Sequence, residues 1–336
     1  MQPRKKIAAT TLVTAVLGVG AVVATNPFVL VRAQFERQRM VAGLEADEVQ
    51  IGDHRWAYAH ADDAPPGAPV VVMLHGFTGS KENWYPVAER LRSQYRLLVP
   101  DLPGWGESER QPDADYGYAA QAQRVAQFIE QVARPIADEG IADKGASGTR
   151  GEVVLLGHSM GGGIAALVAA GHPQLVDRVG LLNASGVLFK DNQFGLDVLA
   201  GSNPFGVSDA ATLKRYIDIL FHREAAKPWI PWPASSGLIA FRREQAQFEQ
   251  QVLEHIGRGP ERFAPGEAAA RIAQPALLLW GRQDQVIDPS AIDLFAQQMP
   301  QATKVLLDDA GHMSLVEQPD AAAAAVTMLI ERGQPR

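Results

Sequence analysis

The stretch of residues 153–171 constrains the fold more than any other part of the chain. Residues 153–156 are all apolar and two of them are β-branched, which predicts a fully buried strand. From Gly161 onward the sequence is rich in alanine and predicts a helix that ends at Gly171, two residues before Pro173. A buried strand that leads directly into a helix is typical of a sheet with helical crossovers.

The junction between this strand and this helix carries a Gly-x-Ser-x-Gly sequence, in which Gly157 and Gly161 flank Ser159. Five residues of this pattern also occur by chance, but the strand–turn–helix context favours a functional motif. The turn holds the serine in a strained backbone conformation that only small neighbours permit. Its hydroxyl would then stand clear of the sheet, above a helix N-terminus. We therefore predict that Ser159 is a nucleophile.

The rest of the chain alternates between short apolar runs and amphipathic segments. Strands are predicted at 48–51, 55–59, 70–74, 96–99, 179–183, 276–280 and 303–307, and helices at 82–91, 118–136, 290–298 and 319–332. Such alternation predicts right-handed crossovers and a mostly parallel, doubly wound α/β sheet that is covered on both faces.

The composition excludes several function classes. The chain has 336 residues, 46% of them hydrophobic, which suffices for one large α/β domain with an insertion or for two small domains. The formal net charge is −7 and no long basic run occurs, which argues against nucleic acid as a partner. The absence of cysteine excludes disulfides, thiolate nucleophiles and cysteine-bound zinc.

The N-terminal residues 1–31 differ from a soluble domain. Three basic residues, 4–6, precede an uncharged and largely apolar run over 7–31. This run fits an uncleaved membrane anchor, since about 20 apolar residues cross a bilayer. A signal peptide cleaved near Ala24, followed by export, is the alternative. Residues 32–47 mix charged with apolar side chains and are expected to form an amphipathic helix that links this segment to the body.

A serine nucleophile needs a general base, and position selects it among the eight histidines. His312 directly follows the last predicted strand and precedes the last helix, where the base is expected in a sheet of this type. His158 is adjacent to Ser159 in sequence, so its side chain points away from that of the serine. We assign a structural role to His158, and to His75 the role of holding its own loop.

Two acids follow the strand at 276–280 and could orient the base. Asp284 lies nearer the strand end, where a loop residue can reach beneath an imidazole. Asp288 precedes Pro289 and fits a helix N-cap followed by proline. We assign the catalytic role to Asp284 and the capping role to Asp288.

Ester hydrolysis also needs donors for the oxyanion that develops on the carbonyl. The backbone N–H of Met160, the residue after the nucleophile, supplies one of them. The second is expected from the loop after the strand at 70–74, and we assign it to Phe77. Gly76 allows the chain to approach the substrate closely.

These features together resemble the α/β-hydrolase superfamily over residues 51–332. Within it the chain is most similar to membrane-anchored monoacylglycerol lipases and to related bacterial lipases and esterases. The resemblance is carried by four segments besides the apolar N-terminus: His75-Gly76-Phe77 with Lys81-Glu82-Asn83-Trp84, Gly157 through Gly162, Asp191-Asn192-Gln193-Phe194, and Trp280 through Val286.

In this family a helical lid interrupts the core. Residues 48–184 and 274–336 are expected to form the two parts of the core, and residues 185–273 the lid. Residues 228–233 and 238–241 and Phe248 supply aromatic and apolar side chains. These side chains either line an acyl channel or pack the lid onto the sheet.

The motifs and the resemblance imply a serine hydrolase of carboxylic esters, such as monoacylglycerols, that needs no metal or organic cofactor. Short-chain esters are an alternative. Hydrolysis of carbon–carbon bonds in acidic ring-fission products is another, for which Arg242 and Arg243 could bind the substrate. A binding module without activity is disfavoured because every catalytic position is filled.

Overall fold

The computed structural model describes residues 22–142 and 150–332 as eight strands and the helices that connect them. The strands are β1 (Glu45–Ile51), β2 (His54–Ala61), β3 (Val70–Leu74), β4 (Arg96–Pro100), β5 (Val153–His158), β6 (Arg178–Leu182), β7 (Ala276–Gly281) and β8 (Thr303–Leu307). The helices are α2 (Val29–Val41), η1 (Lys81–Trp84), α3 (Tyr85–Leu91), α4 (Tyr118–Phe128), η2 (Ile129–Ala133), α5 (Arg134–Ala142), α6 (Met160–Gly171), α7 (Gln193–Leu199), α8 (Ala210–Leu220), η3 (Glu224–Ala226), α9 (Ala234–Gly257), α10 (Ala264–Ala269), α11 (Ser290–Gln298), α12 (Ser314–Glu317) and α13 (Pro319–Glu331).

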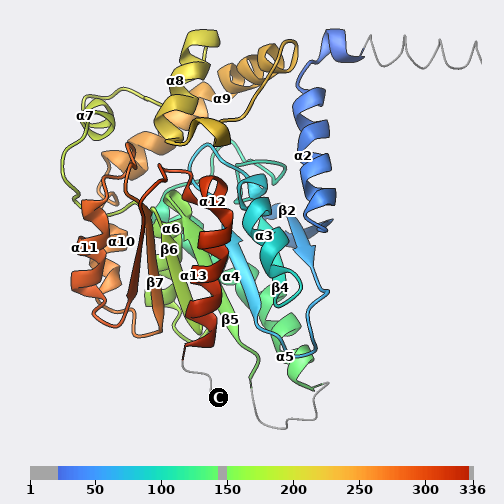
Figure 1. Cartoon of the computed structure of the whole chain (residues 1–336), viewed down its shortest axis with the longest axis vertical. Coiled ribbons are helices and arrows are strands. Elements are labelled where there is room, and N and C mark those ends of the chain that lie inside the picture. The colour runs from blue at the N-terminus through green and yellow to red at the C-terminus, as the bar shows by residue number, and fades with distance from the viewer. Residues whose placement is uncertain (1–21, 143–149, 333–336) are drawn as a thin grey trace, which may run out of the picture.

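The strands form one sheet in the order β1-β2-β4-β3-β5-β6-β7-β8 (Figure 1). β1 and β2 pair antiparallel, as do β2 and β4, and every later pair is parallel. This mixed, mostly parallel sheet confirms the predicted α/β-hydrolase architecture. The carboxyl ends of β3, β5, β6 and β7 meet at one edge, where side chains that follow them in sequence come together.

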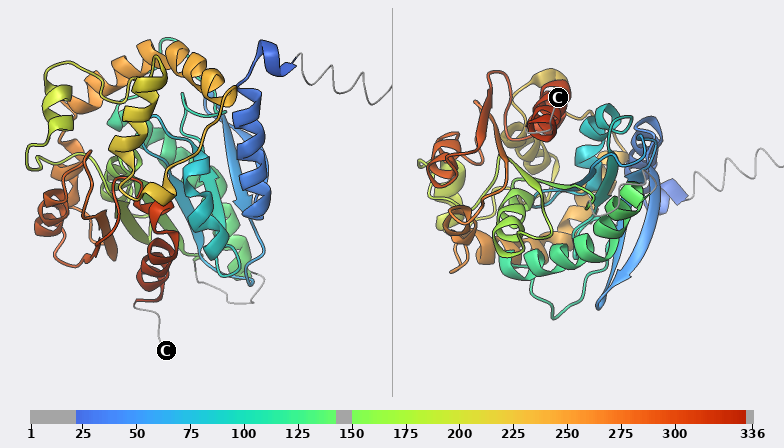
Figure 2. Two further views of the ribbon diagram at one scale, coloured as in Figure 1. Left: turned by 45° about the horizontal axis from the view of Figure 1, so that its top comes forward. Right: turned by 90° about the horizontal axis from the view of Figure 1, so that it is seen from below.

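Helices cover both faces of the sheet (Figure 2). Alternate residues of the central strands explain why: Val70 and Val72 join one core, with α4, α6 and α11, whereas Val71 and Met73 join the other, with α3 and α13. All five residues of β3 are therefore buried. A strand with two covered faces reads as a continuous apolar run, which is the pattern that predicted it.

The region before the sheet differs from the prediction of a helix over 32–47. Helix α2 begins earlier, at Val29, and ends at Val41, and Gly43 follows with a positive φ of 66°. Residues Glu45–Ile51 then form β1, in register with β2 from Glu45 opposite His60. Pairing with β2 outweighs the helical pattern of 45–47. The predicted helix was therefore wrong at both ends.

The predicted membrane segment falls mostly on residues 1–21, outside the described part of the chain. Within residues 22–142 and 150–332, no helix has the length and apolar character needed to cross a bilayer.

The predicted helix over 118–136 is divided into α4, a π-helical turn (η2) and α5, and it extends to Ala142.

The segment between β6 and β7 contains α7, α8, η3, α9 and α10, and we call it the helical insertion (residues 183–275). Its helices α7, α8 and α9 lie beyond one end of the sheet, at the top of Figure 1. It corresponds in position to the lid expected over 185–273.

Helix α6 approaches the ends of β3 and β5 so closely that side chains do not fit between them. A Cβ added to Gly161 would lie 2.5 Å from the carbonyl oxygen of His75 and 2.6 Å from that of Leu74. A Cβ added to Gly157 would lie 2.1 Å from the carbonyl oxygen of Gly161. Backbone atoms form each of these contacts, so the chain itself would have to move to admit a methyl group.

The contact at Gly161 predicts that Gly161→Ala lowers the free energy of unfolding by about 1–3 kcal/mol, the usual effect of overpacking. Gly171→Ala in the same helix is the matched control, because no described atom beyond the adjacent backbone of the helix lies within 4 Å of a Cβ built there. Alanine is the better helix former, so this control should raise the free energy of unfolding by up to about 1 kcal/mol. Urea unfolding measures the free energy of unfolding of both variants. Equal changes in the two variants would contradict the close contact at Gly161.

Candidate functional site

Ser159 lies at the turn between β5 and α6, with φ 55° and ψ −119°. Few non-glycine residues adopt this conformation, and it persists only where the surroundings enforce it. Here the Ser159 N–H donates to the carbonyl oxygen of Leu182 at 3.0 Å, and its own carbonyl accepts from Gly162 and Ser185. A Cβ on Gly76 would lie 2.8 Å from the Cβ of Ser159, so only glycine fits beside the serine.

Asp284 and His312 are joined directly. The His312 Nδ1 lies 2.9 Å from Oδ2 and 3.1 Å from Oδ1 of Asp284, in the loops that follow β7 and β8. Both side chains are buried. A hydrogen on Nδ1 that bonds to the carboxylate leaves Nε2 with a lone pair, which is the state that a general base requires.

The Asp284 carboxylate is buried, and both of its oxygens accept hydrogen bonds. Its Oδ1 accepts the backbone N–H groups of Val286 and Ile287 at 2.8 and 3.0 Å. Its Oδ2 accepts from the amide of Asn183 at 2.8 Å, and Ser314 in turn donates to the Asn183 oxygen at 2.6 Å. These bonds compensate for the lost hydration of the buried charge.

Sequence reasoning missed Asn183. The segment after β6 offers no acid, but it holds an amide that supports the acid of the neighbouring loop. An asparagine directly after a buried strand was the available signal, because this residue type tolerates the left-handed conformation that the structure shows there, with φ 47°. Asp288, as expected, accepts the N–H of Ser290 at the start of α11.

His158 packs against His312 rather than toward the serine hydroxyl. The two rings lie 4.8 Å apart, and His158 Nε2 donates to the carbonyl oxygen of His312 at 2.8 Å. Burial, together with the nearby His312, holds the pKa of His158 well below its usual range. A neutral His158 thus ties the residue next to the nucleophile to the loop that carries His312.

His75 joins the loop after β3 to the loop after β4. Its Nε2 accepts the N–H of Leu102 at 3.0 Å, so Nδ1 carries the hydrogen and donates to the carbonyl oxygen of Gly76 at 2.8 Å. These two bonds define one tautomer of a neutral ring. Burial lowers the pKa of His75 to about 4, consistent with that state.

A largely buried ion cluster also connects the segments that follow β3 and β4. Lys81 Nζ lies 2.8 Å from Asp101 and 2.8 Å from Glu107, and 3.2 Å from Glu82. Burial opposes the ammonium charge, but the adjacent carboxylates outweigh it and raise the pKa of Lys81. The cluster therefore contains a charged lysine and fixes the loop that carries Phe77.

The loop after β3 and the start of α6 carry the two predicted oxyanion donors. Phe77 and Met160 line the same cavity as Ser159. In the described part of the chain, neither of their backbone N–H groups makes a hydrogen bond. Buried N–H groups without partners are rare, and two beside one serine are suited to receive a negative oxygen.

The cavity above Ser159 has a volume of about 180 Å³. It is bounded by the loops after β3, β5, β6 and β7 and by the helical insertion, and its walls are mostly apolar, among them Phe189, Phe194, Val198, Phe205, Leu253 and Ile256. Asn192 attaches this wall to the acid loop by donating to the carbonyl oxygens of Gln285 and Val286.

The aromatic residues for which the sequence left two roles open, lining an acyl channel or packing the lid onto the sheet, lie outside this cavity. Phe248 packs against Trp105 and Tyr116, and Phe241 stacks on Phe28 of the N-terminal region. None of residues 228–233 and 238–241 contributes to the cavity wall. The wall comes instead from residues 185–205 and 253–263 of the same insertion.

The two arginines considered for binding an acidic substrate do not face the cavity either. Arg242 is buried, bonds to Glu249 at 3.0 Å and to the carbonyl oxygen of Phe205, and lies over the ring of Tyr216. Arg243 donates to the carbonyl oxygen of Ser208 at the surface. Both are occupied in structural contacts.

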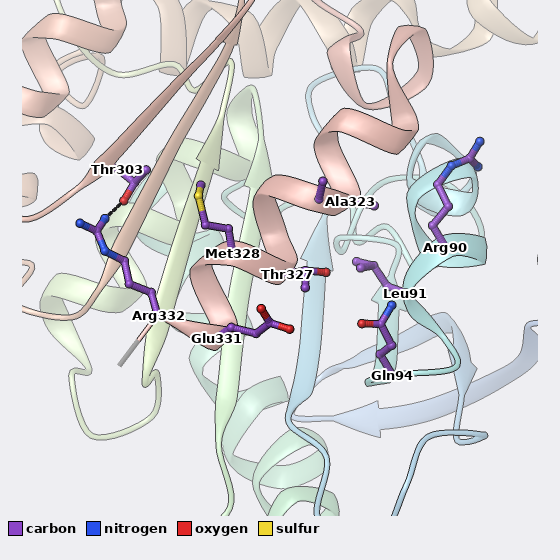
Figure 3. Close-up of a pocket in the computed structure, with 10 residues that line it drawn as sticks. Arg90, Leu91, Gln94, Thr303, Ala323, Thr327, Met328, Glu331 and Arg332 are labelled. Atoms are coloured by element: carbon purple, nitrogen blue, oxygen red, sulfur yellow. Dashed lines mark hydrogen bonds between the residues drawn. The ribbon is translucent and has the colours of Figure 1, made fainter. Parts of the chain in front are cut away.

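A second hollow lies between α3 and α13 (Figure 3). Leu91, Ala323 and Met328 are among its lining residues, and Arg332 at its edge bonds to Thr303. It contains none of the predicted catalytic residues and is open to solvent, so we place the site at the cavity above Ser159.

The structure thus joins Asp284 to His312, and His312 to the residue beside Ser159. No hydrogen bond links the Ser159 hydroxyl to His312 among the described residues. Such bonds are often long before substrate binds and tighten in the complex.

His75 predicts a pH dependence of stability. Its pKa is about 4 in the folded chain against 6.5 when exposed, so only the unfolded chain gains this proton between those values. The free energy of unfolding should therefore fall as the pH is lowered from 6.5 to 4. The expected decrease is about 1.4 kcal/mol per pH unit and about 3 kcal/mol in all. His75→Gln should reduce this slope in urea unfolding at several pH values. An unchanged slope would contradict the neutral, buried state.

Comparisons with known proteins identify the family of this chain. A model of the alpha/beta hydrolase family matches residues 71–325. The chain is 26% identical to Lipase 1 of Psychrobacter immobilis, over 86% of this chain and 84% of that protein. It is 26% identical to human monoacylglycerol lipase ABHD6, over 93% of this chain and 90% of that protein.

Among solved structures, a membrane phospholipase A described as a bacterial virulence factor superposes with a TM-score of 0.81 at 28% identity and covers 98% of both chains. The resemblance expected from the motifs is therefore confirmed. With a family model that spans the sheet from β3 to β8, the elbow and the helical insertion, this chain belongs to the alpha/beta hydrolase family.

Proposed function

We propose that the protein is a serine hydrolase of carboxylic esters with long apolar acyl groups, such as monoacylglycerols. One observation carries the proposal: a strained serine at the floor of an apolar cavity has two unpaired backbone N–H groups beside it and a buried histidine–carboxylate pair in the adjoining loops.

In this proposal His312 takes the proton of Ser159 as the serine oxygen attacks the ester carbonyl. Asp284 orients the imidazole and stabilises its positive charge. The N–H groups of Phe77 and Met160 stabilise the oxyanion. His312 then protonates the departing alcohol, and a water that it activates releases the acid from Ser159.

The cavity wall supports an acyl chain rather than an acidic substrate. Its surface is mostly apolar, and Arg242 and Arg243 are engaged elsewhere. The similarity to lipases points to the same substrate class. We also propose that the apolar run over residues 7–24 attaches the protein to a membrane, where such esters partition.

Ser159→Ala should reduce kcat for p-nitrophenyl ester and monoacylglycerol hydrolysis by at least about 10⁴-fold, because the nucleophile is lost. Asp284→Asn should reduce kcat by about 10³- to 10⁴-fold, since the imidazole loses its orienting charge. Asp288→Asn is the matched control in the same loop and should retain turnover, because Asp288 only caps α11. Undiminished hydrolysis by the Ser159 variant would refute the assignment.

The apolar wall predicts that kcat/KM rises with acyl length, by up to about fourfold per methylene that the cavity holds. Leu199→Trp should reduce the ratio of long-chain to acetyl turnover, because Leu199 lines the cavity. Leu196→Trp is the matched control: it lies on the same helix, is similarly exposed (47% against 50%) and does not line the cavity. The highest kcat/KM with acetyl esters would instead indicate a short-chain esterase. Efficient cleavage of ring-fission dienoates would indicate a carbon–carbon hydrolase.

A further inference from the structure

Two indole side chains in the helical insertion are almost fully exposed. Trp229 is 86% and Trp232 81% exposed, the highest values among the large apolar residues described. They belong to residues 227–233, Lys-Pro-Trp-Ile-Pro-Trp-Pro, which we call the tryptophan loop and which leads from η3 into α9. The other four tryptophans, at positions 56, 84, 105 and 280, are buried.

Such exposure needs an explanation. Neither indole lines the cavity above Ser159, and neither packs on another ring in the described part of the chain. Isolated apolar side chains at a surface are common, but two neighbouring tryptophans present a large apolar area to water. Three prolines restrict the loop, so it loses little conformational freedom when it binds a partner.

The tryptophan loop lies beside the N-terminal region. One helical turn after it, a Cβ added to Gly237 of α9 would lie 2.3 Å from the backbone nitrogen of Phe28, and the ring of Phe28 stacks on Phe241 at 4.4 Å. Figure 1 shows this end of α9 next to the start of α2. The uncharged sequence 7–24 therefore joins the described chain at the same corner of the molecule.

The chemistry at this corner matches the surface of a lipid bilayer. Tryptophan favours the interface between headgroups and acyl chains, where its ring is apolar and its N–H finds a polar partner. The exposed guanidinium of Arg32 lies 5.7 Å from the ring centre of Phe28 and suits a lipid phosphate. An apolar segment that enters a bilayer beside the loop would hold both indoles at that depth.

We propose that the tryptophan loop binds the lipid interface through Trp229 and Trp232 and so orients the helical insertion, with its cavity, relative to the membrane. This inference rests on the membrane attachment proposed above but not on the ester chemistry. The two indoles do not line the cavity above Ser159, so this role is separate from the catalytic one.

The test is tryptophan fluorescence of the full chain with vesicles of phosphatidylethanolamine and phosphatidylglycerol that contain lipid brominated in its acyl chains. Ser159→Ala is used as the background, so that no lipid is hydrolysed. Two of six tryptophans are accessible, so brominated lipid should quench up to about one third of the emission. The quenching should disappear in Trp229→Ala/Trp232→Ala.

The matched control is Met40→Ala/Val41→Ala, which removes exposed apolar surface (64% and 61%) at the far end of α2 and should retain the quenching. Flotation of the vesicles shows separately whether the protein stays bound to them. If the tryptophan variant floats with the vesicles and is quenched as much as the Ser159→Ala background, the loop contact alone is overturned. Failure of the full chain to float overturns the membrane attachment as well. A change in oligomeric mass without quenching assigns the loop to a contact between protein copies and also overturns the proposal.

Discussion

The structure depends on the close contact of α6 with the carboxyl ends of β3 and β5. Gly157 and Gly161 bring backbone against backbone there, so the chain turns within one residue and forces Ser159 into its strained conformation. The same contact leaves the N–H of Met160 at the floor of the cavity. Packing of the sheet thus supplies the free energy that keeps the serine strained.

The loops around the serine are held by buried polar contacts. His75 and the cluster around Lys81 fix the loop of Phe77, whereas Asn183 and the N–H groups of Val286 and Ile287 fix Asp284. A buried polar group restricts geometry strongly because any movement leaves it without a partner. These polar groups therefore position the candidate site.

The helical insertion has two sides with different chemistry. Residues 185–205 and 253–263 face the cavity and are suited to an acyl chain. The end at the tryptophan loop faces outward beside α2. Because α9 runs from this loop to the cavity wall at Leu253 and Ile256, one rigid helix connects the two sides.

The sequence by itself determined the elbow, most of the strands and the positions of His312 and Asp284 after the last two of them, because each is encoded within a few neighbouring positions. Continuous apolar runs define buried strands, and glycines beside Ser159 define the turn. Only the tertiary structure decided what depends on contacts between distant segments: β1 replaced the end of a predicted helix by pairing with β2, and Asn183 met Asp284 from another loop. It also decided that Phe248 packs inside while Trp229 faces solvent, since apolar side chains of a core, a pocket and a binding surface are alike in sequence and differ only in what covers them.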